Sequence, residues 1–236
     1  MDGWQEDQIQ TLLSAKTDAS FFAALTQTAI LLGFDYCAYG MRMPLPVSNP
    51  RLIMLNNYSS SWQQRYANES YIAVDPTVAH GMRSTMPLVW SEDVFTTCRP
   101  FWEDARSHGL HVGLAQSCYD AKGVGGLLSL VRSNDQLSPK ELLHIQLKMS
   151  WLAQIAHEGL SRLLVPKYLP EAAVELTSRE IEVLRWTADG RTSSEASEIM
   201  RISERTVNFH INNVLKKLNV TNKTAAAIKA AVLGLL

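Results

Sequence analysis

Apolar residues recur along residues 1–163 with two different periods, which predicts a domain that mixes helices with strands. Helical spacing covers 5–15, 18–33, 60–70, 76–83, 101–110 and 138–163. Strand-like runs bounded by Gly, Pro and Asn cover 34–43, 51–58, 112–119 and 127–133, and a short apolar segment lies at 87–90. This order favours an α+β chain whose N-terminal part is an α/β/α sandwich around a mainly antiparallel sheet.

The predicted helix 138–163 is apolar on more than one face, at Met149 and Leu152 but also at Leu143 and Leu147. Such a helix needs two surfaces to bury it. One is expected to be the sheet. The other is either a partner subunit or the helix at 5–15, and the pattern leaves both open.

The pattern changes after residue 163. Residues 164–175 contain two prolines and little periodicity, which predicts a linker. Residues 176–236 show helical spacing and no strand signal, which predicts a second, all-helical domain of four helices.

Two capping-box spacings mark helix starts in this second domain, Thr177 with Glu180 and Thr192 with Glu195. Gly190 is suited to end the first helix. Three residues, 201–203, separate the second helix from a third that Ser203 is placed to cap. That separation is typical of a helix-turn-helix.

The third helix of this motif has an apolar face and a polar face. The apolar positions are Val207, Ile211, Val214 and Leu218, at spacings of four, three and four. The polar face is formed by Arg205, Thr206, Asn208, Asn212, Asn213 and Lys216.

The polar face suits DNA. Arg and Asn side chains match the edges of guanine and adenine, which favours Arg205, Thr206, Asn208 and Asn212 as base-reading residues. Lys216, Lys217 and Lys223 are expected at phosphates. A solvated surface face would explain any one of these residues. The capped helices, the three-residue turn and the basic face together favour DNA binding.

Charge distribution agrees with this interpretation, although the whole chain of 236 residues has a net charge of only −1. From residue 199 to the end, six Lys or Arg stand against Glu204, a net of +5. Cys37, Cys98 and Cys118 have neither disulfide nor metal spacing, which indicates separate reduced thiols. The acidic first residues do not resemble a signal peptide, and no apolar run approaches a membrane span of about 18 residues. A cytoplasmic protein is expected.

The stretch LTSREIEVLRWTADG, followed by TSSEASEIMRISERTVNFHINNVLKKLNV, resembles the C-terminal module of LuxR-type transcription regulators. Glu180, Leu184 and Gly190 fall on three positions characteristic of that family. The resemblance implies a fourth helix, here 222–233, that can pair with its twin in a dimer. Response regulators share the same module, so it does not identify the input.

The first domain could receive its signal as phosphorylation, as a catalysed reaction or as a bound small ligand. A phospho-receiver needs an alternating βα series and an early acidic pair, yet only Asp35 is present. Catalytic and phosphate-loop motifs are missing, so no catalytic residue is predicted. Ligand binding is supported by aromatic residues clustered around Asp75, which suit a small-molecule pocket: Tyr58, Trp62, Tyr66, Trp90, Phe101 and Trp102. An aromatic core with Asp75 as a helix cap explains the same cluster.

Family resemblance favours the ligand. Trp62, Tyr66, Asp75-Pro76, Trp90 and Gly113 sit at positions typical of acyl-homoserine-lactone receptors. The resemblance implies that Trp62 donates to the lactone carbonyl and that Asp75 accepts the amide N–H. It further implies two donors to the amide carbonyl, Tyr58 and Ser129, and four residues packed around the ligand, Tyr66, Trp90, Phe101 and Ala105, with Thr77 also in the binding set. The acyl chain is expected along Ala38, Gly40, Met43 and Leu127.

The chain is therefore predicted to be a ligand-responsive transcription factor without cofactor, metal or catalytic site. It is expected to bind an N-acyl homoserine lactone through residues 1–163 and a near-palindromic promoter site through residues 176–236, as a homodimer, with RNA polymerase as a candidate partner and no membrane. The alternative is a DNA-binding regulator whose first domain serves only for dimerisation or partner binding.

Overall fold

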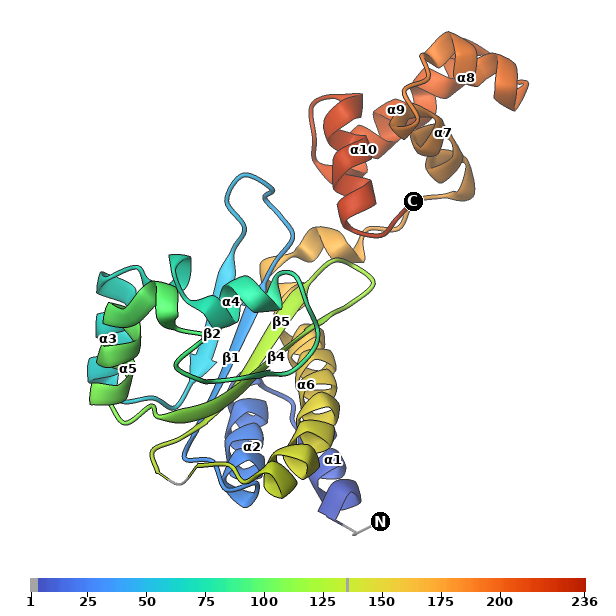
Figure 1. Cartoon of the computed structure of the whole chain (residues 1–236). Helices are drawn as coiled ribbons and strands as arrows, with labels where there is room; N and C mark the ends of the chain where they lie inside the picture. The colour runs from blue at the N-terminus through green and yellow to red at the C-terminus, as the bar shows by residue number, and fades with distance from the viewer. Residues whose placement is uncertain (1–3, 135) are drawn as a thin grey trace. The chain divides into compact units, whose positions relative to one another are not determined.

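The computed structural model describes residues 4–134 and 136–236, which form two compact units (Figure 1). The first unit takes in the described residues up to Arg42, together with 52–120 and 124–164. The second takes in 165–236 with two short loops, 43–51 and 121–123. Each unit has its own buried core.

A five-stranded antiparallel sheet forms the centre of the first unit, in the order β2-β1-β5-β4-β3. Its strands are β1 (Tyr36–Arg42), β2 (Leu52–Asn56), β3 (Leu88–Val89), β4 (Val112–Tyr119) and β5 (Gly125–Arg132). The predicted strands are confirmed, and the segment at 87–90 supplies the short edge strand. β5 begins two residues earlier than predicted, because Gly125 and Gly126 still pair with both neighbouring strands.

Helices cover both faces of the sheet, which confirms the α/β/α sandwich (Figure 1). One face carries α1 (Trp4–Ser14), α2 (Asp18–Leu31) and α6 (Pro139–Tyr168). The other carries α3 (Ser60–Asn68), α4 (Pro76–Gly81) and α5 (Arg99–Ser107), with the 3₁₀ turns η1 (Tyr71–Ala73) and η2 (Thr96–Cys98).

Helix α6 packs closely against the sheet and α2. A Cβ atom on Gly159 would lie 2.0 Å from the ring of Phe21, so this crossing requires glycine. Nδ1 of His157 and the hydroxyl of Tyr39 on β1 are hydrogen-bonded at 2.7 Å, with both residues buried. On the second apolar face of α6, Leu143 is 66% exposed and Leu147 is 72% exposed.

Helix α6 also extends into the segment predicted to be a linker. It continues to Tyr168 and contains Pro166 in its last turn, and the 3₁₀ turn η3 (Pro170–Ala173) follows. Leu164 and Val165 are buried, and their burial favours helix despite the hydrogen bond that a proline removes.

Four helices form most of the second unit: α7 (Ser178–Ala188), α8 (Ser193–Met200), α9 (Glu204–Leu218) and α10 (Lys223–Val232). Both predicted capping boxes are present, and the Ser203 hydroxyl accepts a hydrogen bond from the Thr206 N–H. Gly190 has φ of +84°, a left-handed conformation that suits glycine after a helix. The helix-turn-helix is confirmed.

Across residues 4–134 and 136–236, no helix combines the length and apolarity that crossing a membrane requires. Cys37, Cys98 and Cys118 are all free and buried.

Candidate functional site

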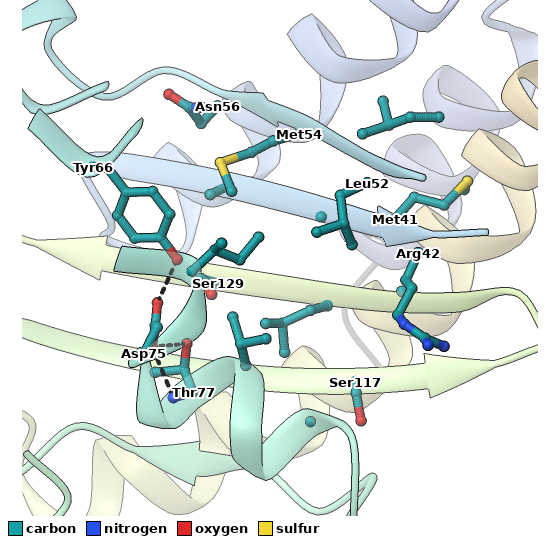
Figure 2. A pocket seen from close by; sticks show the side chains of 18 of the residues that line it. Met41, Arg42, Leu52, Met54, Asn56, Tyr66, Asp75, Thr77, Ser117 and Ser129 are labelled. Atoms are coloured by element: carbon teal, nitrogen blue, oxygen red, sulfur yellow. Dashed lines mark hydrogen bonds between the residues drawn. The ribbon is translucent and has the colours of Figure 1, made fainter. Parts of the chain in front are cut away.

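A cavity of about 660 Å³ lies in the first unit between the sheet and the helices α3 and α4 (Figure 2). Eight of the nine predicted ligand-binding residues line it: Tyr58, Trp62, Tyr66, Asp75, Thr77, Trp90, Ala105 and Ser129. Segments that lie far apart in the sequence therefore meet at one site. Most of the remaining lining is apolar, which is usual for a small-molecule pocket.

Asp75 is the centre of the polar end. It precedes Pro76 at the start of α4, and its Oδ1 accepts hydrogen bonds from the Thr77 N–H at 2.8 Å and the Thr77 hydroxyl at 2.7 Å. The Tyr66 hydroxyl donates to Oδ2 at 3.0 Å (Figure 2). Asp75 thus caps a helix with one oxygen and presents the other toward the cavity. The two interpretations of the sequence, a helix cap and a ligand-binding carboxylate, therefore both apply to it.

Burial governs the electrostatics of this carboxylate. It raises the pKa of Asp75 above its ordinary value, and the hydrogen bonds from Thr77 and Tyr66 offset that only in part. A charged carboxylate in an apolar cavity is costly unless it is fully partnered. Burial also raises the pKa of Tyr58, so its phenol keeps its proton.

Several donors around Asp75 have no acceptor. Among the described residues, the buried indole N–H of Trp90 has no partner. In the same part of the chain, neither the Tyr58 nor the Ser129 hydroxyl donates a hydrogen bond, and the Trp62 indole N–H has no acceptor either. The polar end can therefore serve a ligand with several acceptor oxygens and one N–H.

Two predicted positions differ in the structure. Phe101 does not line the cavity; it lies behind Trp62, with ring centroids 5.8 Å apart, in the aromatic core. Met43, predicted along the acyl chain, is fully buried and does not line the cavity, whereas Ala38, Gly40 and Leu127 do. In β1, Cys37, Tyr39 and Met41 are buried in alternation with Ala38 and Gly40, and Met43 continues the buried series. Met41 also lines the cavity, whereas Cys37, Tyr39 and Met43 do not.

Gly113 has a clear steric role. A Cβ atom there would lie 2.7 Å from the indole ring of Trp90, so any side chain would displace that ring. Trp90 in turn meets Phe95 edge to face, with centroids 5.6 Å apart. This glycine therefore lets β4 approach the wall of the cavity closely.

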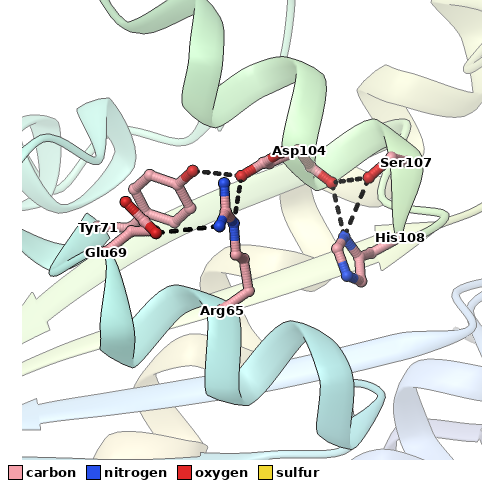
Figure 3. A network of polar contacts seen from close by, with 6 residues as sticks. All are labelled: Arg65, Glu69, Tyr71, Asp104, Ser107 and His108. Atoms are coloured by element: carbon pink, nitrogen blue, oxygen red, sulfur yellow. Dashed lines mark hydrogen bonds and ion pairs between the residues drawn. The ribbon is translucent and has the colours of Figure 1, made fainter.

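A polar network fixes α3 against α5 outside the aromatic core (Figure 3). Nε of Arg65 donates to Asp104 at 2.7 Å, and its Nη1 donates to Glu69 at 3.0 Å. The Tyr71 hydroxyl donates to the same carboxylate of Asp104. Hydrogen bonds from Tyr71 and Arg65 lower the pKa of Asp104. The network positions Trp62 and Tyr66, which α3 carries, relative to Ala105 on α5.

Part of the cavity wall was missed by sequence reasoning. Leu52, Met54 and Asn56 of β2 and Val78 and Met82 from the α4 region line it. The sequence did indicate that Leu52, Met54 and Asn56 share a face, because residues two apart in a strand point to the same side. Nothing in the sequence shows which face of β2 meets a cavity.

In the second unit, the exposed side of α9 includes an apolar residue among the predicted polar ones. Arg205, Phe209, Asn212 and Lys216 follow each other at spacings of four, three and four and are all exposed. This stripe lies opposite the buried Val207, Ile211, Val214 and Leu218, which were predicted correctly. Phe209, 60% exposed, was missed because an apolar residue was not expected on a polar face.

Three of the predicted DNA-binding residues have partners within the unit. Oδ1 of Asn208 accepts a hydrogen bond from Ser193 at 2.9 Å, and the Thr206 hydroxyl is hydrogen-bonded to Ser203 at 2.8 Å. Nζ of Lys217 lies 2.7 Å from the buried Glu180. Within the described residues, Arg205, Asn212, Lys216 and Lys223 make no hydrogen bond or ion pair through their side chains.

No cluster of three or more His, Cys, Asp or Glu suited to a metal ion occurs in residues 4–134 or 136–236.

Comparison with known proteins agrees with both units. The family described as "Autoinducer binding domain" matches residues 17–160, and "Bacterial regulatory proteins, luxR family" matches residues 174–230. The transcriptional activator protein AnoR of Acinetobacter nosocomialis is 49% identical over 238 residues, covering 100% of both chains.

Two solved structures extend the comparison. The crystal structure of Escherichia coli SdiA has a TM-score of 0.87 and 33% identity over 99% of this chain and 98% of that one. CepR2 of Burkholderia cenocepacia, described as an N-acylhomoserine lactone dependent LuxR family transcription factor, has a TM-score of 0.63 and 30% identity, over 68% of this chain and 95% of that one. The chain belongs to the luxR family of bacterial transcription regulators and joins an autoinducer-binding domain to a DNA-binding helix-turn-helix.

Proposed function

We propose that the cavity of the first unit binds an N-acyl homoserine lactone, and that this ligand controls DNA binding by the second unit. The observation that carries the proposal is the arrangement at the polar end. Asp75 presents one acceptor oxygen, while Trp62, Tyr58 and Ser129 present donors that have no acceptor in the described residues. An acyl homoserine lactone has one amide N–H and several carbonyl oxygens, which is the matching set.

In the bound state, Asp75 accepts the amide N–H and Trp62 donates to the lactone carbonyl. Tyr58 and Ser129 donate to the amide carbonyl, while Tyr66, Trp90 and Ala105 pack around the lactone and Thr77 holds Asp75 in place. Phe101 supports Trp62 from behind and does not contact the ligand. Kinship with CepR2, which is described as dependent on such a lactone, supports the same ligand class.

Thermal melting of the full chain tests the proposal, because a ligand that binds only the folded state stabilises it by mass action. A panel of lactones should raise the melting temperature of the first unit, and the free fatty acids of the same length, which lack the amide N–H, should raise it far less. A folded protein that shifts with no lactone would contradict the proposal. It would favour the alternative, a first domain that serves only dimerisation or partner binding.

The DNA-binding form is proposed to be a homodimer in the cytoplasm, with residues 1–163 for ligand binding and dimerisation and residues 176–236 for DNA. Support comes from the exposed Leu143 and Leu147 of α6, one helical turn apart, because an apolar patch of this kind favours association. Two copies would place their α9 helices in successive major grooves, about 34 Å apart, on a near-palindromic site.

Light scattering checks the dimer. Leu147→Glu should shift the ligand-bound protein to the monomer, whereas Ile30→Glu, at another exposed apolar position, on α2, should not. A monomeric parent protein would contradict the dimer.

Gel-shift titration with and without lactone gives the sign of the response. Transcription in vitro then tests RNA polymerase as a partner, since a regulator that contacts polymerase raises transcription from its bound site. No catalytic step and no cofactor is part of the proposal.

A further inference from the structure

The sheet forms the floor of the cavity through three successive residue pairs between β1 and β5, called rungs below. The first rung pairs Ala38 with Ser129, and the second pairs Gly40 with Leu127. The third pairs Arg42 with Gly125. All six residues line the cavity. Figure 2 shows Asp75, Tyr66 and Ser129 at one end and Leu52, Arg42 and Ser117 at the other. The cavity therefore extends lengthwise along β1, starting from its polar end.

The rungs give the cavity a length. From Ala38 to Arg42 are four residues of a strand, or about 13 Å at roughly 3.3 Å per residue. An extended chain covers about 1.2 Å per bond, since a fully extended residue of three bonds spans about 3.3–3.6 Å. About 13 Å is therefore the reach of a chain of roughly ten to twelve carbons.

Space above the middle rung is open. A Cβ atom added to Gly40 would meet no atom within 4 Å, so the cavity passes directly over this residue. At the third rung, Leu52 is paired with Arg42, lines the cavity and is 52% exposed. Met82, directly after α4, also lines the cavity and is 61% exposed. A short ligand would leave these apolar side chains in water, whereas the end of a long chain would cover them.

Resting on the proposed function, we infer that the ligand is a lactone with a long acyl chain of about ten to twelve carbons, and that Gly40 sets this length. A larger side chain at Gly40 would close the cavity at the second rung. Leu52 and Met82 bind the last carbons of the chain.

Titration of the full chain with lactones of four to fourteen carbons tests the inference. Affinity should rise about four-fold per added CH₂, the equivalent of roughly 0.8 kcal/mol, and should level off near ten to twelve carbons. A maximum at eight carbons or fewer would overturn the inference and leave the proposed function standing. A lack of binding by every lactone would instead overturn the proposed function.

Two variants sharpen this test. Gly40→Val should move the preferred length to six carbons or fewer and keep the affinity for the four-carbon lactone. Leu52→Ala should weaken only the ligands of ten carbons and longer, by a few-fold, and because the side chain is 52% exposed the fold should tolerate its loss. An equal loss at all lengths in Gly40→Val, or no change in preference, would contradict the role of Gly40.

An independent observation concerns Phe209 on α9. Its ring is 60% exposed in the middle of the stripe that contains Arg205, Asn212 and Lys216. Charged and amide side chains on both sides fit a nucleic acid better than an apolar protein partner. Phe is one of the side chains that contact the 5-methyl group of thymine in the major groove. We propose that Phe209 recognises a thymine methyl group in each half of the DNA site.

Replacing single thymines by uracil removes only this methyl group and tests the proposal. With a site selected from random DNA, the parent protein should lose about four-fold in affinity at one position of each half-site, the equivalent of roughly 0.8 kcal/mol for one methyl-sized group. Phe209→Ala should bind the thymine and uracil sites equally.

Ile199→Ala, which removes another exposed apolar side chain from the same unit, should keep the uracil sensitivity of the parent. A parent that is indifferent to every uracil would overturn the proposal. Unchanged uracil sensitivity in Phe209→Ala would overturn it as well.

Discussion

Each unit contains one buried carboxylate at the start of a helix, and the two are held differently. Asp75 is 9% exposed before α4, and Glu180 is 3% exposed in the first turn of α7. Each accepts a backbone N–H, from Thr77 and Thr177 respectively. Glu180 has a cationic partner, Lys217 at 2.7 Å. The other hydrogen-bond donors to Asp75 are also neutral: the hydroxyls of Tyr66 and Thr77 and the backbone N–H of Val78.

The pKa shifts of these two groups have opposite signs. Burial raises the pKa of Glu180, but the hydrogen bonds from Lys217 and Thr177 outweigh it, so the pKa is lowered overall. For Asp75, burial prevails and the pKa is raised. The fold therefore stabilises the charge of Glu180 by itself and leaves that of Asp75 incompletely stabilised. A buried carboxylate of the second kind indicates a binding site, because it lacks a partner that a ligand can supply.

The largest expected effect is the loss of ligand response in Asp75→Asn. At a hundredfold excess over its Kd, a ligand stabilises the folded state by about 2.7 kcal/mol. Losing a hydrogen bond to a charged acceptor costs about 1.5–3 kcal/mol, so affinity should fall roughly ten- to hundred-fold and most of the thermal shift should disappear. Melting curves with and without lactone measure this.

Asp93→Asn, at an exposed carboxylate of the same unit, serves as the control and should keep the parent shift. An undiminished shift in Asp75→Asn would mean that the two carboxylates are equivalent, and the comparison would fail.

The next effect is on the stability of the second unit. Lys217→Met should lower its free energy of unfolding by about 1–2 kcal/mol, because the buried Glu180 loses its cation. This is less than the roughly 3–5 kcal/mol of a fully buried pair, since the Lys217 side chain is 38% exposed. Urea unfolding of residues 165–236 within the full chain, followed through Trp186, provides the measurement. A change within experimental error would show that Glu180 does not depend on Lys217.

The pH dependence of the two carboxylates should be opposite in sign. Stability contributed by Glu180, whose pKa is lowered, is complete above the ordinary value of 4.5 and is lost as pH falls through the folded pKa. The unfavourable contribution of Asp75, whose pKa is raised, is complete at neutral pH and disappears as pH falls through its folded pKa toward 3.8.

Unfolding of the ligand-free protein from pH 7 to pH 3 should show both trends against the parent. Asp75→Asn should be as stable as the parent or slightly more stable at pH 7, and this difference should shrink at pH 4. Glu180→Gln should be less stable at pH 7, and its deficit should also shrink on acidification. A deficit of the same size for both variants at pH 7 would contradict the assignment.

The smallest expected effect is a difference between Lys216 and Lys217 in the salt dependence of DNA binding. Lys216→Ala should reduce the slope of log affinity against log salt by about one unit and leave stability unchanged, since a phosphate contact adds about 0.9 to that slope. Lys217→Ala should lower stability and change the slope much less, because its charge is already paired with Glu180. Filter binding at four salt concentrations distinguishes them, and identical slopes for both variants would place the two lysines in the same role.

Local features could be predicted from sequence, because the residues that create them are neighbours in the chain. The Thr177 cap on Glu180 and the buried stripe from Val207 to Leu218 arise within one or two helical turns. The strands were also identified, and family resemblance supplied the residues at the polar end of the cavity, although much of the rest of its lining was not predicted.

Features that depend on long-range pairing could not be predicted. The three rungs require β1 and β5 to pair in one register across almost ninety residues of chain. Phe101 lies in the aromatic core and not at the cavity surface because of how α5 packs against Trp62. Glu180, the partner of Lys217, lies two helices earlier in the chain. No local pattern encodes these distances, so the sequence could place neither Met43 outside the cavity nor Lys217 beside Glu180.

The burial of one face of β1 controls the chemical reactivity of Cys37, which lies on that face. Its side chain is inaccessible, and burial raises the pKa of its thiol, so the reactive thiolate forms only when the first unit opens. The rate at which a thiol reagent modifies Cys37 therefore measures the frequency of that opening. Ligand that fills the cavity should slow the modification in proportion to its occupancy, which gives a covalent record of signal concentration without any DNA or reporter.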